Sequence, residues 1–448
     1  MTASTRGNQS RKGRQSGTTE TGWRSLDQLI NDYAKKSLPE HTLLSIPGKD
    51  TNRGKATLLG KIRLALEEKV DPASLVDLWA FVLSNAIRNL KFYDTREFQT
   101  PPNRDIDQLP FGIDRLRDYF GQFIKFERLL YGTERYYRDH VKHVFKVWLL
   151  GCALLEEFFL DHSGTSYSMT LDVVEPQKHV PFNHSRHELD AAWCVASLCH
   201  DLGYPLAKVA ALNAAVRDML KYYGSVQLGD FSFHFSGHNR FIDDSVLRII
   251  SSRVRSHEES EGKVPPADPG EALAASRYAT SLQTKYYLKL SKSLEDLAHG
   301  IISAFVVFKN LVYFLETDYV LENEYKLGFE DARQFTIRRE ILRAVAGHTC
   351  PEIYHFQSGT LPFFLLLVDE MQFWGRPTFD KMFDNFSPPD VLLGPDFTRN
   401  CWQFMIRLPV SKIGGGNQLF LSKASMFKKV LRTGADFHRR DFTLDLRI

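Results

Sequence analysis

This chain has few cysteines, no long apolar run and no large excess of one charge. Its five cysteines are spread over 448 residues without regular spacing, so they do not form the framework of a disulfide-rich secreted protein. No apolar run reaches the ~18 residues that a membrane-spanning helix needs, and the N-terminus lacks the apolar core of a secretory signal. We therefore expect a cytoplasmic protein with buried thiols and no membrane partner.

The charge balance and the missing motifs exclude further classes of protein. Lys and Arg number 57 against 54 Asp and Glu, and a net charge of +3 gives no strong nucleic-acid signal. The chain has no Gly-x-x-x-x-Gly-Lys loop, no His-Glu-x-x-His and no Gly-x-Ser-x-Gly. These absences argue against P-loop ATPases, zincin proteases and ordinary serine hydrolases. The mixture of 43% hydrophobic and 25% charged residues is typical of a soluble globular protein.

The spacing of the apolar residues predicts a mainly α protein. Residues 1–22 are polar, basic and rich in Gly, Ser and Thr, so we expect a disordered tail there. Between residues 23 and 129, apolar residues recur every three or four positions, which is typical of amphipathic helices. Asp71 and Pro72 stand where an N-cap and a first helical residue are expected. The helical stretches predicted in this N-terminal region are 23–36, 56–70, 71–90 and 112–132.

The same spacing continues through a predicted core at 130–380, which carries two insertions. Residues 163–186 form the first insertion, with a strand expected at 167–174. The charged, Pro-containing residues 256–275 form the second. The main helices expected in the core are 135–160, 191–199, 276–317, 329–348 and 363–374.

The character of the sequence changes near its end. After about residue 395 the apolar residues alternate with polar ones, which is typical of strands. We therefore expect residues 381–448 to form a small α/β extension that serves as an interface or a regulatory piece. The predicted strands lie in 400–410, 417–423 and 442–448.

Several predicted helices carry a metal-capable side chain in an apolar setting. Asp is rarely buried unless it is paired or bound to a metal, and imidazole together with carboxylate suits divalent first-row metals. Taken singly, such a residue is more often a hydrogen-bonded core residue, which leaves a purely structural helical protein open. A shared metal explains why stretches far apart in the sequence would each point one polar group inward. The residues are His140, His143, His200, Asp201, His299, His348 and Asp369.

The stretch AAWCVASLCHDLGYP resembles the most specific motif of the HD superfamily of metal-dependent phosphohydrolases. That family has a helical core with the order His, His-Asp, Asp. In this chain His200-Asp201 matches the pair, and Asp369 matches the last Asp. The stretch HVFKVWLLG looks like the family's first-histidine helix and places that histidine at His143. The resemblance covers roughly residues 130–375 and implies an HD-type helical bundle.

The resemblance also implies a set of metal ligands. In branches that bind two metals, such as cyclic-dinucleotide phosphodiesterases, two further histidines hold the second ion. His299 and His348 match these histidines, with Asp201 bridging the two ions. We expect one or two divalent ions per chain, of Mn, Fe, Mg or Zn. The residues that match the ligands of the first ion are His143, His200, Asp201 and Asp369.

Two residues have expected catalytic roles. Asp201 can offer one carboxylate oxygen to each of two ions, and such ions activate a water for attack on phosphorus. His140 lies one helical turn before His143 and faces the same way, so it is a candidate general acid or a support for the ligands.

Basic residues near the ligands are candidates for contact with substrate phosphates. Many relatives follow the His-Asp pair with Gly-Lys, whereas this chain has Gly-Tyr-Pro, which leaves Lys208 as a substitute. Other basic residues flank the expected metal-bearing helices, and a solvated helix face is the alternative role for each. They are Lys289, Arg339, Arg343 and Arg376.

The resemblance leads to one expected activity and leaves others open. We expect a hydrolase of nucleotide phosphate esters or anhydrides. The leading hypothesis is a dNTP triphosphohydrolase, because some large soluble HD proteins deplete nucleotides in bacterial antiviral defence. The two extra histidines favour the alternative, a two-metal phosphodiesterase of cyclic nucleotides or dinucleotides. A third hypothesis is a module that senses a nucleotide without cleaving it, although a sensor has no need to keep every metal ligand. The sequence leaves the substrate base and sugar, the metal and a homo-oligomeric state undetermined.

Overall fold

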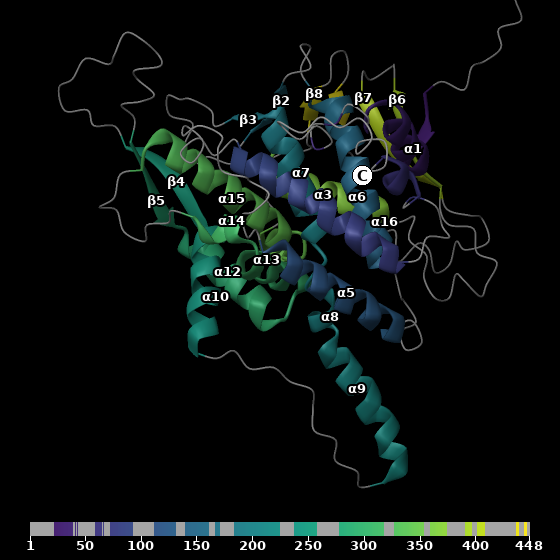
Figure 1. Cartoon of the computed structure of the whole chain (residues 1–448), viewed down its shortest axis with the longest axis vertical. Helices are drawn as coiled ribbons and strands as arrows, with labels where there is room; N and C mark the ends of the chain where they lie inside the picture. The colour runs from purple at the N-terminus through teal and green to yellow at the C-terminus, as the bar shows by residue number, and fades with distance from the viewer. Residues whose placement is uncertain are drawn as a thin grey trace, which may run out of the picture.

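The structure is a computed structural model, and it describes the protein as mostly helical with small β-sheets (Figure 1). Among the described residues no helix is both long and apolar enough to cross a membrane. The described residues are 22–38, 41, 43, 59–64, 66, 72–92, 112–130, 139–160, 166–170, 183–224, 237–257, 277–317, 327–353, 359–373, 390–396, 401–407, 436–438 and 443–445.

Five helices form the centre of the molecule, and their sequences explain why. All five are buried around nearly the whole helix, as in a helix enclosed by neighbours. Four of them carry a run of apolar residues, whereas Phe329–Gly347 buries several polar and charged side chains along with its apolar ones. The first, second, fourth and fifth pack in a closed ring, and the third packs on the fourth. This arrangement confirms the prediction of a mainly α core. The helices are α6 (His140–Phe158), α7 (Arg186–Cys199), α13 (His299–Asn310), α15 (Phe329–Gly347) and α16 (Leu361–Phe373).

Close contact between α6 and α7 depends on one small residue. A Cβ placed on Gly151 of α6 would lie only 1.9 Å from the ring of Trp193 on α7, so only glycine allows this approach. The indole Nε1 of Trp193 then donates to the Trp148 carbonyl at 2.8 Å. A packed aromatic ring and a buried hydrogen bond therefore fix the two helices that carry the first site residues.

The N-terminal helices pack directly on this core. α3 contacts α7 and α5, and α1 contacts α6. The indole Nε1 of Trp79 on α3 donates to the Leu198 carbonyl in the last turn of α7, at 3.0 Å. Pro72 is the first residue of its helix, as predicted, whereas Asp71 lies outside the described residues. These helices are α1 (Leu26–Lys36), α3 (Pro72–Phe92) and α5 (Ile113–Leu130), and residues 59–64 are also helical.

A five-stranded sheet joins the two ends of the described chain in the order β1-β6-β7-β9-β8. Its pairs are antiparallel except for β7 with β9, which is parallel. Strands were predicted in 400–410 and 442–448 and are found there, while 417–423 lies outside the described residues. The sheet contains β1 (Arg24–Ser25), β6 (Asp390–Asp396), β7 (Cys401–Arg407), β8 (Asp436–His438) and β9 (Thr443–Asp445).

One antiparallel strand pair lies within the first predicted insertion, and another borders the second. β2 (Ser166–Thr170) pairs with β3 (Asn183–Ser185), in agreement with the strand expected near 167–174. β4 (Ser252–His257) pairs with β5 (Arg277–Leu282), so the prediction of a helix over 276–317 was wrong for Arg277–Leu282. In β5 the buried side chains alternate along the chain with partly exposed ones, which is the two-residue period of a strand.

Shorter elements complete the described chain. The hairpin β4–β5 lies with α10 and α12 at the left of Figure 1, and α9 extends away from the other helices at the bottom. The remaining elements are α8 (Tyr204–Ala207), α9 (Val209–Leu220), η4 (Lys221–Tyr223), α10 (Gly237–Ile250), α12 (Thr284–Glu295), α14 (Val312–Leu315) and η5 (Pro351–Ile353).

Candidate metal centre

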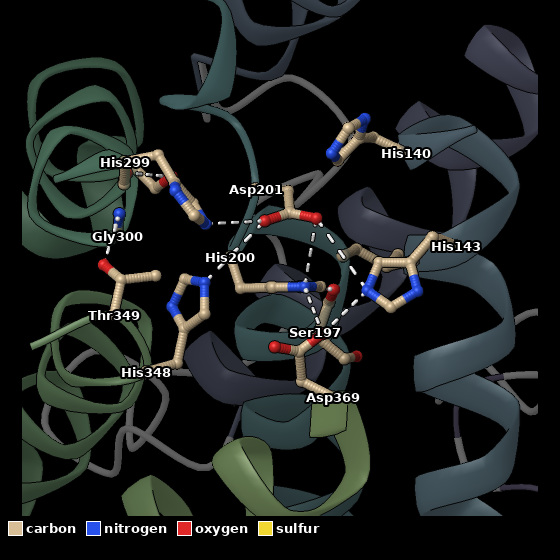
Figure 2. A network of polar contacts seen from close by, with 12 residues as sticks. His140, His143, Ser197, His200, Asp201, His299, Gly300, His348, Thr349 and Asp369 are labelled. Carbon is tan, nitrogen blue, oxygen red and sulfur yellow. Dashed lines mark hydrogen bonds and ion pairs between the residues drawn. The ribbon is translucent and has the colours of Figure 1, made fainter. Parts of the chain in front are cut away.

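Five helices bring the six predicted ligands to one point (Figure 2). Most of them stand at a helix end, where a side chain can reach the centre of the bundle without displacing the core. One lies near the start of α6, two directly follow α7, one is the first residue of α13, one directly follows α15, and one lies within α16. In this order they are His143, His200, Asp201, His299, His348 and Asp369.

The carboxylate of Asp201 lies between two groups of histidines, and each group faces a different oxygen. Oδ2 lies 3.8 Å from His143 Nε2 and 3.4 Å from His200 Nε2. Oδ1 lies 3.2 Å from His299 Nε2 and 3.7 Å from His348 Nε2. Figure 2 shows the two groups on opposite sides of the carboxylate. Asp201 is therefore placed to bridge two half-sites. The first half-site contains His143 and His200, and the second contains His299 and His348.

Asp369 completes the first half-site. Its Oδ1 lies 2.8 Å from His143 Nε2 and 3.6 Å from His200 Nε2. The ligand atoms around Asp201 and Asp369 form three overlapping groups. Within each group, all the ligand atoms lie within 4.8 Å of one another, which is close enough to share an ion. The first half-site thus has two imidazoles and two carboxylates, and the second has two imidazoles and the shared carboxylate.

Main-chain carbonyls set the tautomers of two of these histidines. His200 Nδ1 lies 2.7 Å from the Ser197 carbonyl, and His348 Nδ1 lies 2.7 Å from the Val345 carbonyl. A carbonyl oxygen can only accept, so Nδ1 carries the proton and Nε2 of the neutral ring keeps its lone pair. Metal-binding histidines are commonly held in this way.

The donor set fits a divalent cation. Nε2 of His200 is buried, and within the described part of the chain no hydrogen bond satisfies it. Such an atom is costly to bury unless something binds it. Nitrogen and carboxylate oxygen ligands suit Mn, Fe and Zn. These buried residues can hold a metal ion, and the identity of the metal is not fixed by them.

The electrostatics of the cluster favour a positive charge at its centre. Burial by itself lowers the pKa of His200, but Asp201 and Asp369 outweigh it and raise that pKa to about 9. Burial disfavours both carboxylates as anions, yet the surrounding imidazoles hold their pKa values well below the usual range. Burial lowers the pKa of His348, which keeps this ring neutral. Two negative carboxylates thus attract protons when no cation is present.

Small residues hold α13 against the end of α7. The Gly203 amide donates to Ser303 Oγ at 2.7 Å, and a Cβ on Gly203 would lie 2.3 Å from the His299 carbonyl oxygen. The Gly300 amide donates to Thr349 Oγ1 at 3.0 Å, next to His348. These contacts bring the second half-site to the first.

His140 lies beside the cluster and has a buried partner that the sequence analysis missed. Its Nδ1 lies 2.7 Å from Glu127 Oε1, and its main-chain amide donates to the same oxygen at 2.9 Å. Figure 2 shows His140 on the opposite side of Asp201 from Asp369. Glu127 could have been found from its spacing, because it falls three and four positions after the buried residues Ile124 and Phe123.

The residues expected to contact substrate are placed differently from one another. Arg339 and Arg343 are buried, and Arg339 donates to Glu340 Oε1 at 2.9 Å. Arg343 donates to the Ile250 carbonyl at 2.8 Å, where α10 meets β4. We therefore correct these two assignments, since these guanidinium groups hold the framework together.

Of the two lysines expected at the site, one is bonded to the framework and the other is partly exposed. Lys289 donates its Nζ proton to the Glu352 carbonyl and so ties α12 to η5. Lys208 is partly exposed between α8 and α9, with Nζ 5.0 Å from the centre of the Tyr204 ring. Arg376 lies outside the described residues.

A second buried histidine–carboxylate pair, which the sequence analysis also missed, lies along α7. His41 Nε2 is 3.7 Å from Asp190 Oδ1 and 3.6 Å from Cys152 Sγ. The Leu43 amide donates to His41 Nδ1 at 3.2 Å. Nε2 therefore carries the proton of the neutral ring and points it at these two acceptors, so it has no lone pair for a metal.

Comparison with known proteins adds no relative: no protein-family model, no curated protein and no solved structure matches this chain. Function must therefore be argued from the site itself.

Proposed function

We propose that the protein is a metal-dependent hydrolase of nucleotide phosphate esters or anhydrides, built on an HD-type helical bundle. The observation that carries the proposal is the division of the Asp201 carboxylate between two half-sites, with one oxygen facing each pair of imidazoles. The ligand order along the chain and the HD-like motif at His200-Asp201 support the same class. Carboxylate-bridged dications are typical of phosphoryl-transfer sites.

The chemistry divides between the bound ions and the chain. Divalent ions, when bound, supply a water of lowered pKa and withdraw negative charge from the phosphoryl oxygens. The chain's own part is to exclude bulk water and to orient these groups. His200 is fully buried and Asp201 nearly so, which strengthens every charge interaction inside the site.

His140 and Glu127 supply the proton for the leaving group. Glu127 accepts from His140 Nδ1 and stabilises the positive charge that the ring carries when both nitrogens are protonated. The ring lies next to Asp201, whose carboxylate is stabilised in part by the field of His140. A histidine held in this way is a suitable general acid.

We place dNTP triphosphohydrolase first among the substrates and retain a second candidate. The pair His299 and His348 completes a second half-site with Asp201, and this observation favours a two-metal phosphodiesterase of cyclic nucleotides or dinucleotides. Both reactions break a bond between phosphorus and a sugar oxygen, so both need the proton from His140.

A panel of substrates with product analysis tests the proposal. Purified full-length protein is loaded with Mn²⁺ or Fe²⁺ and incubated with dNTPs, NTPs, cyclic mononucleotides and cyclic dinucleotides. Release of inorganic triphosphate identifies a triphosphohydrolase, and a linear dinucleotide or a nucleoside monophosphate identifies a phosphodiesterase. Saturable nucleotide binding without any turnover by the metal-loaded protein would contradict the enzyme and indicate a sensor.

A further inference from the structure

Tyr204 lies between the proposed proton donor and a metal-capable histidine. Its ring centre is 3.7 Å from that of His140, with 33° between the planes. Its ring centre is also 5.9 Å from that of His299, with the planes at 74°. The aromatic residue therefore contacts one residue from each functional part of the site: the Glu127–His140 pair and the second half-site.

The backbone around Tyr204 is fixed from two directions. The Tyr119 hydroxyl of α5 donates to the Leu202 carbonyl at 2.6 Å. From the other direction, the Gly203 amide donates to Ser303 Oγ of α13 at 2.7 Å. The Tyr204 amide also donates to the Asp201 carbonyl at 3.0 Å, which ties the main chain at the start of α8 to the bridging residue. The short helix α8 is thus a rigid support between α5 and α13.

The side chain of Tyr204 is also held in place. The Lys208 ammonium lies 5.0 Å from the ring centre, within the range of a cation–π contact. The residue is half-buried. Its ring therefore has little freedom to turn away from His140.

His140 needs such a neighbour because one hydrogen bond does not fix a ring. The bond from Nδ1 to Glu127 sets where one nitrogen lies, but the ring can still rotate about that contact. Stacking on Tyr204 restricts the plane of the ring as well. The two contacts together determine where Nε2 points.

We propose that Tyr204 is a positioning residue for proton transfer, an inference that rests on the proposed function. It sets the plane of the His140 ring so that the Nε2 proton reaches the leaving oxygen of the substrate. A hydroxide oxygen derived from water forms the new bond to phosphorus as the bond to the leaving oxygen breaks. The electron pair of the broken bond stays on the leaving oxygen, which takes the Nε2 proton. His140 is left neutral, with its Nδ1 proton still held by Glu127, and Nε2 regains a proton from solvent before the next turnover.

This role predicts a dependence on the leaving group. A sugar alkoxide is a poor leaving group and depends on the proton, whereas a p-nitrophenolate is a good one and depends on it little. Loss of the Tyr204 ring should therefore slow the first kind of substrate and spare the second. A purely structural role would slow both alike.

The experiment compares Tyr204→Leu and Tyr204→Phe with wild type on two substrates. One is the nucleotide turned over best by the wild type, and the other is thymidine 5′-p-nitrophenyl phosphate. For Tyr204→Leu we expect kcat on the nucleotide to fall about 10- to 100-fold, with KM little changed, and kcat on the nitrophenyl ester to fall less than ~3-fold. Tyr204→Phe keeps the ring and should restore kcat on the nucleotide to within ~3-fold of wild type.

Two further readouts do not depend on turnover. Metal content of Tyr204→Leu, measured by elemental analysis, should equal that of the wild type. In metal-free protein labelled at histidine, the His140 ring protons should move downfield in Tyr204→Leu, because the ring current of the tyrosine is lost. Tyr204→Gln provides a polar replacement if the leucine variant does not fold.

The outcomes separate this inference from the proposed function. Equal losses on both substrates, or unchanged His140 resonances in a folded variant, overturn the positioning role and leave the hydrolase intact. Failure of the metal-loaded wild type to cleave either substrate overturns both.

Discussion

Two buried histidine–carboxylate clusters lie along α7, and only one of them is suited to hold a metal. Asp190 and Asp201 are both almost fully buried, and each lies within 4 Å of an imidazole. The difference lies in the main chain. An amide donates to Nδ1 of His41, whereas Nδ1 of His200 donates to a carbonyl. One hydrogen bond thus decides which ring offers a proton and which offers a lone pair.

The two clusters also differ in how their charge is balanced. Beside Asp190 the chain supplies a fixed cation, because Arg186 Nε lies 3.9 Å from its carboxylate. Burial lowers the pKa of His41, so this ring stays neutral. Beside Asp201 the ion-pair partners within the described residues are imidazoles, and a second carboxylate, Asp369, lies close by. Burial and residue type alone therefore do not identify a metal centre. A buried carboxylate that has no Lys or Arg beside it is a further indication of one.

The largest contrast should come from removing each carboxylate in turn. Asp201→Asn takes a charged bridge from both half-sites, and we expect metal affinity to fall more than ~100-fold, a loss of roughly 3–5 kcal/mol. Hydrolysis should be abolished. Asp190→Asn is the matched control: it should bind metal normally and lose about 1–3 kcal/mol of folding free energy. Metal content and denaturant unfolding measure the two effects, and normal turnover by Asp201→Asn would disprove the site.

Addition of metal should stabilise the protein through the Asp201 cluster alone. A ligand that binds only the folded state at about 100 times its Kd adds about 2.7 kcal/mol of stability. We expect Mn²⁺ to raise the melting temperature of the wild type and of Asp190→Asn, and a chelator to reverse the rise. A similar rise in Asp201→Asn would place the ion elsewhere.

Single histidines should separate the two half-sites. His348→Ala removes a ligand from the second half-site, so we expect affinity there to drop at least about 10- to 100-fold, with the first half-site still filled. The control, His41→Ala, leaves metal stoichiometry unchanged although it opens a cavity. Titration calorimetry with elemental analysis measures both, and loss of all metal from His348→Ala would argue against two separable half-sites.

A smaller effect is expected from the support of the second half-site. In Gly203→Ala the new methyl group would meet the His299 carbonyl at 2.3 Å, so α13 must shift. We expect a cost of about 1–3 kcal/mol in stability and weaker binding of the second ion. Gly121→Ala, within α5 where a Cβ meets nothing within 4 Å, should instead gain about 0.5–1 kcal/mol. Thermal unfolding of both variants checks the difference.

The helices and the candidate ligands could be predicted because their signals are local. Apolar spacing indicated the core helices, and a His or Asp in an apolar stretch stood out within a few residues. The partners of these residues depend on distant contacts. The Glu127–His140 pair needs α5 to pack beside the start of α6, and the His41–Asp190 pair needs a segment before α3 to reach α7. No short window of sequence carries that information.

The errors have the same origin. Arg339 and Arg343 looked like phosphate ligands because their charge was visible, while the carbonyls of Ile250 and Ser252 that receive their protons were not. β5 follows a long insertion and was assigned to a helix because its partner, β4, precedes that insertion. Strand pairing across a gap in sequence is a tertiary property.

The pairing of β1 with β6 has a consequence for biosynthesis. Arg24 and Ser25 pair with Leu393 and Leu392, so the first described strand meets its partner only when most of the polypeptide has emerged from the ribosome. Helices can collapse on one another as they appear, but this β-ladder closes late. A nascent chain stalled before residue 390 would carry all six predicted metal ligands and still leave the strand Arg24–Ser25 without that partner.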